Sequence, residues 1–286
     1  MRIGLVSNPY KDPGYQVLYQ VADVITKLGA TPVFQITDNA QGADDPALNA
    51  YFVDCDVLVS MGGDGTFLNA VHGNSQANLP MLGMNLGSLG FMAEVQRDEI
   101  RPALHRIING DFRVEERMLL DVRSTNLKGE ETFSGFALNE VLLSRGGNAR
   151  IVPIELTLDG KYIELISCDG LMVSTPTGST GYAMAAGGPI VHPSMSLMQI
   201  TPVCPHSLHN RTYIVPADSV VKLNLRQYPY HAALITDGRE ETPFADTDEV
   251  EIKQSPRKLN LIRLDDHNFY QELPGKLRGR AYPKSI

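Results

Sequence analysis

The chain has 286 residues, a formal net charge of −8, 43% hydrophobic residues and 20% charged residues. This length suits one large or two ordinary domains, and the composition is that of a folded globular protein rather than a disordered one. The acidic balance argues against nucleic-acid binding and against docking on anionic membranes, because both need a basic surface. No basic-then-apolar N-terminal segment and no long apolar run occurs, so we expect neither a signal peptide nor a membrane span.

The three cysteines are Cys55, Cys168 and Cys204. Their number is odd and no pair has C-x-x-C spacing, which argues against a disulfide framework and against a zinc site. We therefore expect reduced thiols and a cytoplasmic location.

The N-terminal part alternates short apolar runs with apolar residues at helical spacing, and Gly29 and Gly110 end the two helical patterns. This alternation predicts a parallel sheet covered by helices, with ligands at the C-terminal ends of the strands. Strands are expected at residues 3–7, 32–36, 56–61 and 80–85, and helices over 17–28 and 98–108.

After Phe112 apolar residues recur at every second position, as in strands. Turn signals also recur, among them the hairpin turn Asp159-Gly160. Many short strands predict a sandwich or a rolled sheet. Strands are expected at residues 112–123, 132–143, 151–158, 161–166, 171–174, 213–215, 220–225, 231–235, 249–253 and 258–264.

The expected fold is thus an N-terminal Rossmann-like α/β domain over residues 1–110, followed by a β-rich, sandwich-like domain over residues 111–266. The tail from 267 to 286 has apolar anchors and clustered basic residues, and we expect it to pack back on the first domain.

One strand of the first domain runs into Gly62, Gly63, Asp64, Gly65 and Thr66, here called the glycine loop, before a helical pattern begins. Backbone N–H groups of such a loop, together with the positive end of the helix dipole, suit a phosphate. No P-loop lysine and no G-x-G-x-x-G spacing is present, so nucleotide phosphates would be held by backbone donors, the Asp64 carboxylate and a bound metal. The alternative is a plain strand-to-helix turn capped by Asp64.

Asn139 and Glu140 interrupt an apolar strand. A buried carboxylate is costly unless it is paired or binds a ligand, and an amide beside a carboxylate can clamp a ribose. The alternative is a bulge or edge position with Glu140 in solvent.

Residues 174–189 interleave Ser and Thr with Gly and Pro, and Tyr182 offers a stacking face for a base. The alternative is a surface connector, although the apolar flanks indicate that this segment is held in place. His72 and His206 could be acid-base groups, but we expect both to be structural.

Together these motifs resemble the NAD kinases over nearly the whole chain. The Thr-Pro-Thr-Gly-Ser-Thr block is the most specific, whereas the glycine loop alone is similar to that of diacylglycerol-kinase-like and phosphofructokinase-like enzymes. The motifs that carry the resemblance are Gly62 to Thr66, residues 85–91, Asn139-Glu140, Asp169-Gly170, residues 175–182 with Gly187-Gly188-Pro189, and residues 202–206.

The resemblance implies transfer of a phosphoryl group from ATP, with a divalent metal such as Mg²⁺, to the 2′-hydroxyl of the adenosine ribose of NAD, which gives NADP. It implies that Asp64 is the catalytic base or orienting group, and that the enzyme is a homodimer or homotetramer. The glycine loop would bind the ATP phosphates through Gly62, Gly63, Gly65 and Thr66, and no side chain is assigned as a metal ligand. The resemblance assigns NAD binding to Asp64, Gly65, Asn69, Phe91, Asn139, Glu140, Arg150, Asp169, Thr180, Gly181, Tyr182, Ala183, Met184 and Ala185.

The sequence departs from the family pattern at three positions. Asn69, five residues after Asp64, stands where a basic residue or His is usual. Ser167, two residues before Asp169, stands where strictly NAD-preferring members have Arg. Relatives that also accept NADH have small or polar residues at this position, and some of these relatives use inorganic polyphosphate. Gly181 replaces the usual Ala, which loosens the loop.

Two other functions remain open. The first is a lipid or sugar kinase of the same loop class, although the sequence has no amphipathic basic helix for a lipid surface. The second is a non-catalytic NAD(P)-sensing module, against which Asp64 argues, since a carboxylate repels phosphates.

Overall fold

The computed structural model describes residues 1–36, 51–74, 78–87, 90–147, 149–206, 211–239, 241–265 and 268–281. The chain forms two compact units, the first made of Met1–Glu116 with Leu259–Ile286 and the second of Arg117–Lys258. Within the described ranges, no helix is both long and apolar enough to cross a bilayer.

The first unit is built on a parallel sheet with the order β4-β3-β1-β2. Strand β5 and the end of β17 also pair in parallel with β4. The strands are β1 (Arg2–Ser7), β2 (Thr31–Phe34), β3 (Val57–Gly62), β4 (Met81–Asn85) and β5 (Ala93–Val95). The predicted α/β fold of this part is therefore confirmed.

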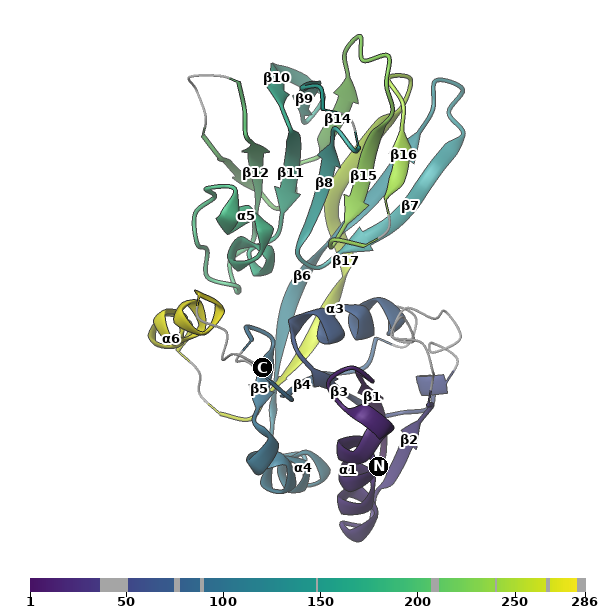
Figure 1. Ribbon diagram of the computed structural model, residues 1–286, viewed down its shortest axis with the longest axis vertical. Helices are drawn as coiled ribbons and strands as arrows, with labels where there is room; N and C mark the ends of the chain where they lie inside the picture. Colours follow the sequence, from purple (N-terminus) through teal and green to yellow (C-terminus); the bar gives the residue numbers. More distant parts are fainter. Residues whose placement is uncertain are drawn as a thin grey trace. The chain divides into compact units, whose positions relative to one another are not determined.

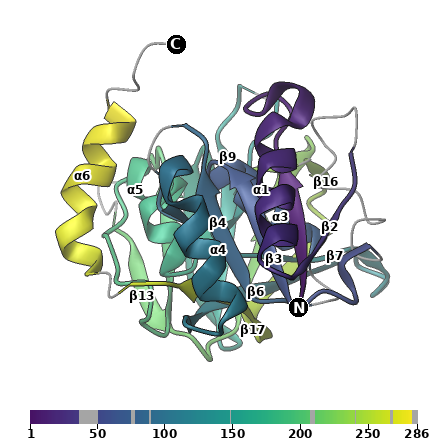
Figure 2. The same cartoon turned by 90° about the horizontal axis from the view of Figure 1, so that it is seen from below.

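Helices cover both faces of this sheet (Figure 1). Helices α1 and α4 lie side by side on one face (Figure 2), where their apolar residues form one core with the strands. Helix α3 packs against β3 on the opposite face. The helical elements are η1 (Pro13–Tyr15), α1 (Gln16–Lys27), α3 (Asp64–Gly73), η3 (Arg97–Glu99) and α4 (Ile100–Ile108).

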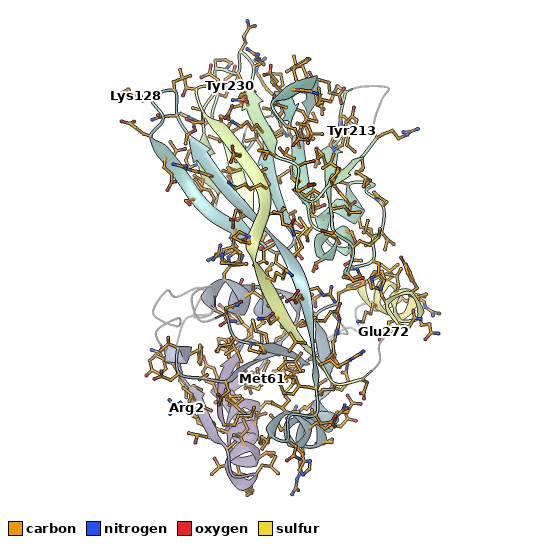
Figure 3. All side chains as sticks on the ribbon, turned by 180° about the vertical axis from the view of Figure 1, so that it is seen from behind. Arg2, Met61, Lys128, Tyr213, Tyr230 and Glu272 are labelled. Atoms are coloured by element: carbon orange, nitrogen blue, oxygen red, sulfur yellow. The ribbon has the colours of Figure 1, made fainter. Side chains whose placement is uncertain are left out.

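Strand β3 is buried along its whole length, which explains its continuous apolar sequence. Met61 lies among the side chains of the unit's interior (Figure 3) and is fully buried. Helix α1 begins at a buried carboxylate, because Asp12 accepts hydrogen bonds from the N–H groups of Val17 (2.8 Å) and Leu18 (3.0 Å). These bonds satisfy two N–H groups of the first helical turn.

The second unit is a sandwich of two sheets, as the sequence predicts. In one sheet, β9, β10, β14 and β17 pair antiparallel, and β6 pairs with β17 and β7. The other sheet is antiparallel throughout, with the order β13-β12-β11-β8-β15-β16. The first sheet contains β6 (Arg113–Thr125), β7 (Glu131–Ala137), β9 (Val152–Leu158), β10 (Lys161–Cys168), β14 (Val221–Leu225) and β17 (Glu249–Arg263). The second contains β8 (Glu140–Ser144), β11 (Gly170–Ser174), β12 (Leu197–Val203), β13 (Tyr213–Pro216), β15 (Ala232–Thr236) and β16 (Thr242–Phe244).

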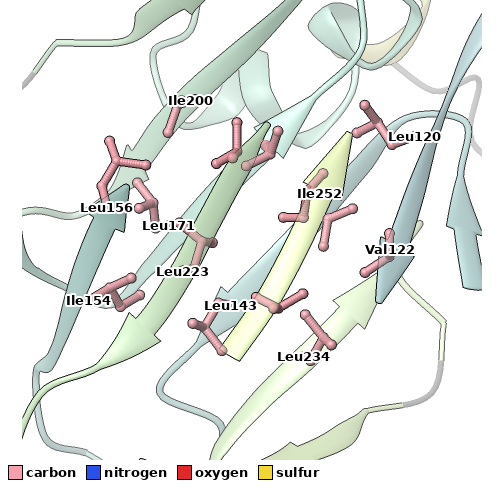
Figure 4. Close-up of a cluster of buried hydrophobic side chains, with 14 of the residues drawn as sticks. Leu120, Val122, Leu143, Ile154, Leu156, Leu171, Ile200, Leu223, Leu234 and Ile252 are labelled. Carbon is pink, nitrogen blue, oxygen red and sulfur yellow. The ribbon is translucent and has the colours of Figure 1, made fainter. Parts of the chain in front are cut away.

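Apolar side chains of both sheets meet in one core, shown in Figure 4. Val141 and Leu143 of β8, and Leu171 and Val173 of β11, point into this core. Because side chains alternate along a strand, Glu140 and Ser174 lie on the opposite face of their sheet.

Three expectations about the strands are wrong. The predicted strand 132–143 is two strands, β7 and β8, which belong to different sheets. The predicted strands 249–253 and 258–264 form the single strand β17, which continues through Pro256. Strands β5, β12 and β16 were not predicted; Pro202 in β12 and Pro243 in β16 weaken the strand pattern.

The boundaries of the units also differ from those expected. The end of β17 belongs to the first unit, so the second unit ends at Lys258 rather than at 266. Ile262 and Leu264 are part of the core of the first unit, which is the physical reason for this boundary. Helix α6 (Phe269–Ala281) also belongs to the first unit, and the ammonium group of Lys276 lies 5.7 Å from the centre of the Phe91 ring.

Candidate functional site

The glycine loop joins β3 to α3. A Cβ at Gly62 would lie 2.3 Å from Oγ1 of Thr66, and a Cβ at Gly63 would lie 2.5 Å from Nζ of Lys11. Neither glycine has a positive φ angle. At Gly62 the close approach of the Thr66 side chain, rather than a left-handed backbone, requires glycine, whereas the flexible Lys11 side chain beside Gly63 can move aside.

The carboxylate of Asp64 has a fixed orientation at the start of α3. Its two oxygens accept hydrogen bonds from the backbone N–H groups of Phe91 (3.1 Å) and Met92 (3.0 Å). A Cβ at Gly90 would lie only 2.2 Å from Oδ1 of Asp64, so glycine is needed there as well. The structure thus brings the predicted residues Asp64 and Phe91 together, and the Asp64 side chain is half-buried.

The other predicted residues of the first unit follow along α3. Gly65 is exposed in the first turn, and Asn69 lies half-buried about one turn later. Thr66 is buried, and its hydroxyl oxygen accepts a hydrogen bond of 3.1 Å from the side-chain amide of Asn8. Positions 88 and 89 of the second glycine motif lie outside the described residues.

Lys11 was not predicted as a site residue. It is exposed in the loop after β1, and its ammonium group reaches Gly63 of the glycine loop. The sequence offers no lysine at P-loop spacing, but the fold supplies a cation from another loop. A signal in the sequence is present, because Lys11 closely follows the first strand of an α/β fold, the strand end where ligands bind.

Glu140 is a buried acidic residue of the second unit. It starts β8 in the middle of its sheet, is only 8% exposed, and its Oε2 has no hydrogen-bond partner. Burial, and then the negative charge of Asp237, raises the pKa of Glu140 to about 7. The alternative that Glu140 lies in solvent is therefore wrong.

The backbone beside Glu140 is held from two sides. The N–H groups of Leu138, Asn139 and Glu140 donate hydrogen bonds of 2.8, 2.7 and 3.1 Å to the carboxylate of Asp237. On the other side, the N–H of Thr175 donates to the carbonyl of Asn139 (2.9 Å). These bonds end one strand and start the next, which explains why the predicted strand is divided here.

The Ser/Thr-rich segment packs close to this backbone. A Cβ at Gly178 would lie 2.1 Å from the carbonyl oxygen of Asn139. Ser179 is fully buried, and its hydroxyl bonds both backbone groups of Val191 (3.0 and 3.1 Å). The segment contains the 3-10 helix η4 (Thr177–Thr180) and the short helix α5 (Tyr182–Ala185). Because residues 174–180 are all buried, the alternative of a surface connector is wrong.

The predicted base-contacting residues lie in this segment. A Cβ at Gly181 would lie 3.4 Å from Oε2 of Glu140, so the segment is in contact with that carboxylate. Thr180 and Ala183 are buried, whereas the ring of Tyr182 is 45% exposed and available for stacking. Met184 is half-buried and Ala185 is exposed.

Asp169 and Arg150 are not beside Glu140. Gly170, next to Asp169, pairs with Ser144, whereas Ser174 pairs with Glu140, so four residues of strand separate the two positions. At about 3.3 Å per residue this is roughly 13 Å. Asp169 instead pairs with Arg145 at 3.2 Å.

Arg150 makes a different contact. Its guanidinium carbon lies 5.8 Å from the centre of the ring of Tyr230, which is labelled in Figure 3. His72 is buried in α3, and His206 is exposed, with its backbone N–H donating to the carbonyl of Ser167. Across the described part of the chain, no three His, Cys, Asp or Glu side chains are placed to hold a metal ion.

Two domain families match the chain. Residues 138–264 match the ATP-NAD kinase C-terminal domain, and residues 47–112 match the ATP-NAD kinase N-terminal domain. The NAD kinase of Natranaerobius thermophilus is 36% identical over 97% of this chain and 98% of its own length.

Two solved structures share the fold. Yeast NADH kinase complexed with NADH has a TM-score of 0.84 and 22% identity, and the match covers 100% of this chain and 89% of that one. An NAD kinase from Archaeoglobus fulgidus in complex with ATP has a TM-score of 0.75 and 24% identity, with 98% and 99% covered. Taken with the domain matches and the bacterial relative, these comparisons show that the chain belongs to the ATP-NAD kinase family.

Proposed function

We propose that this enzyme transfers a phosphoryl group from ATP to the 2′-hydroxyl of the adenosine ribose of NAD and so forms NADP. The proposal depends above all on Glu140, a buried carboxylate with an unsatisfied oxygen beside the segment that carries Tyr182. Buried polar groups are normally hydrogen-bonded, so an unsatisfied one indicates a place for a ligand. Ribose hydroxyls can donate to this carboxylate, and the Tyr182 ring can stack on a base.

Asp64 is proposed as the general base. The two N–H donors from Phe91 and Met92 fix the direction of its carboxylate, which would accept the proton of the attacking hydroxyl. Phosphoryl transfer requires alignment and charge neutralisation more than covalent work from the protein. A fixed carboxylate is therefore sufficient for the protein's part of the proton transfer.

The glycine loop is proposed to bind the ATP phosphates. Its backbone N–H groups and the N-terminus of α3 favour negative charge, and the ammonium group of Lys11 lies against Gly63. A divalent metal ion bound with ATP would neutralise phosphate charge. Mg²⁺ usually keeps phosphate oxygens and waters as ligands, which fits a protein whose described residues provide no metal cage of their own.

NADH as acceptor and polyphosphate as donor are proposed as additional substrates. Ser167 supports this proposal, because it stands in β10 where strictly NAD-preferring relatives are expected to have Arg. Ser167 cannot make the charged, bidentate hydrogen bonds that an Arg would make at this position.

We also propose a cytoplasmic homodimer or homotetramer. The edge strands β10 and β13 expose apolar side chains, with Tyr162 61%, Leu165 47% and Ile214 49% exposed. Apolar residues gathered on sheet edges are typical of protein interfaces. Light scattering should give a dimer or tetramer mass, and Leu165→Glu should lower that mass; a monomeric wild-type protein would refute the proposal. The cysteines are free and Cys204 is exposed, which suits a reducing compartment.

The activity is tested with purified protein, NAD, ATP and Mg²⁺, with NADP measured by an NADP-specific dehydrogenase. NADP formation is expected, and parallel reactions with NADH and with polyphosphate measure the choice of acceptor and donor. A panel of sugars and diacylglycerol tests a kinase of other substrates. A folded protein that binds NAD but forms no product with any donor would refute the proposal and favour a sensing module.

A further inference from the structure

Asp237 lies at the end of β15 and was not singled out by its sequence. Its side chain is buried, with 6% exposure, and its backbone has a left-handed conformation with φ of 53°. Gly238 follows with φ of 67°. Asp followed by Gly, both with positive φ, is the usual sequence of a tight hairpin turn, here between β15 and β16.

The task visible in the structure is to hold the backbone of Leu138, Asn139 and Glu140. The carboxylate of Asp237 accepts all three of their N–H groups, and the N–H of Asp237 donates to the carbonyl of Glu140 (2.9 Å). These residues lie where the chain leaves β7 in one sheet and enters β8 in the other. Buried N–H groups at such a crossing need partners, and Asp237 supplies them. The directions of the Asn139 and Glu140 side chains therefore depend on Asp237.

Asp237 also acts on Glu140 through its charge. After burial, the negative charge of Asp237 is the second cause of the raised pKa of Glu140. Two further neighbours of Glu140 are uncharged: Ser174 on β11 pairs with it across the sheet, and Gly181 lies over its Oε2. Among the described residues, Asp237 is thus the charged group whose removal is expected to change the titration of Glu140.

We propose that Asp237 is a positioning residue for dinucleotide binding, which fixes the Asn139-Glu140 backbone and sets the pH range in which Glu140 binds NAD. This proposal rests on the proposed function, because Glu140 is taken to accept hydrogen bonds from NAD. In this proposal Asp237 acts through Asn139 and Glu140 rather than through contact with a substrate. The ionised form of Glu140 accepts hydrogen bonds from both hydroxyls of a ribose, so NAD binding weakens as Glu140 becomes protonated.

The test compares Asp237→Asn with Asp248→Asn in the full-length protein. Asp248 is a matched control, because it is also buried (7% exposed) and accepts the N–H of Ala245 (2.9 Å) in a turn of the same unit. The KM for NAD, the KM for ATP and kcat are measured from about pH 5.5 to about pH 8.5, a range that brackets the pKa of Glu140. Calorimetric binding of NAD is measured over the same range.

For Asp237→Asn, the KM for NAD is expected to rise about tenfold at the alkaline end, the loss typical of one hydrogen bond to a charged group. kcat and the KM for ATP should change little, because the lost interaction holds bound NAD in both the ground and transition states. Removing the charge lowers the pKa of Glu140, so the acidic limb of NAD binding should move to lower pH. Asp248→Asn should keep the wild-type profile.

Two results would overturn the proposal. One is an Asp237→Asn enzyme with the wild-type KM for NAD, and the other is an acidic limb that does not move. If Asp237→Asn fails to fold, hydrogen exchange on the wild-type protein remains decisive. The amides of Asn139 and Glu140 should then be protected from exchange. Fast exchange there would show that the Asp237 carboxylate does not hold these N–H groups. A wild-type protein that binds NAD normally but forms no NADP would refute the proposed function while leaving the binding comparison valid.

Discussion

Replacement of Glu140 by Gln should stabilise the ligand-free protein while it abolishes NAD binding. The pKa of Glu140 is raised from 4.5 to about 7, and Gln keeps the shape of the side chain without its charge. Each pKa unit corresponds to about 1.4 kcal/mol, so ionising Glu140 costs the native state about 3 kcal/mol. Residues that bind a ligand often lower the stability of the ligand-free protein, and Glu140 is expected to be such a residue.

The sign of this effect depends on pH. Between pH 4.5 and about 7 the folded protein holds a proton on Glu140 that the unfolded chain has lost, so wild-type stability falls as the pH rises. The two proteins should therefore be similarly stable near pH 4.5, and Glu140→Gln should be more stable by up to about 3 kcal/mol near pH 8.

Urea denaturation at both pH values, followed by a signal from the second unit, measures this difference. Glu131→Gln is the matched control, since the Glu131 side chain is 46% exposed and pairs with Arg123 at the surface. A Glu140→Gln protein that is no more stable than wild type near pH 8, or whose advantage is the same at both pH values, would show that the carboxylate is not buried in its charged form.

Three further changes test other parts of the site. Asp64→Asn should fold normally and lose about 10²–10⁴-fold in kcat, as expected for a general base; a rate near wild type in the coupled NADP assay would remove Asp64 from the mechanism. Lys11→Met should raise the KM for ATP about tenfold through loss of one charged contact with phosphate. The control Lys27→Met, which removes an exposed ion pair with Asp23, should leave this KM unchanged. A wild-type KM for ATP in Lys11→Met would exclude Lys11 from phosphate binding. Gly181→Ala should lower stability by more than about 0.4–1 kcal/mol, because the φ of −93° and ψ of −132° of Gly181 lie outside the α and β regions that L-residues adopt; an unchanged or higher melting temperature would show that the loop relaxes to accept Ala.

The sequence predicts the fold well where local pattern and tertiary environment agree. The apolar run of β3 is a strand because it is buried on both sides, and the alternating pattern of β9 follows the two-sided pleat of the sandwich. The apolar neighbours of Glu140 likewise indicate that this carboxylate is buried. The glycine loop and Tyr182 could be proposed from the same kind of local signal.

Other parts depend on residues that are far apart in the chain. Asp237 and Glu140 are 97 positions apart, so no local pattern in the sequence links the Asp237 carboxylate to the Glu140 backbone N–H that it accepts. The same applies to Lys11 and Gly63, which meet only because β1 and β3 are neighbours in the sheet. Asp169 precedes β11 at the end opposite to Ser174, the residue that pairs with Glu140, and the order of the motifs along the chain does not show this separation.

The assignment of residues from 259 onward to the first unit has a consequence for biosynthesis. Leu261 pairs with Met81, and Ile262 is buried in the core made by the opening strands of the chain. Domains usually fold as they leave the ribosome, N-terminal part first. Here the first unit lacks part of its core until residues 259–264 have been synthesised, whereas the second unit has all its residues by Lys258. The unit synthesised second is thus able to finish folding first.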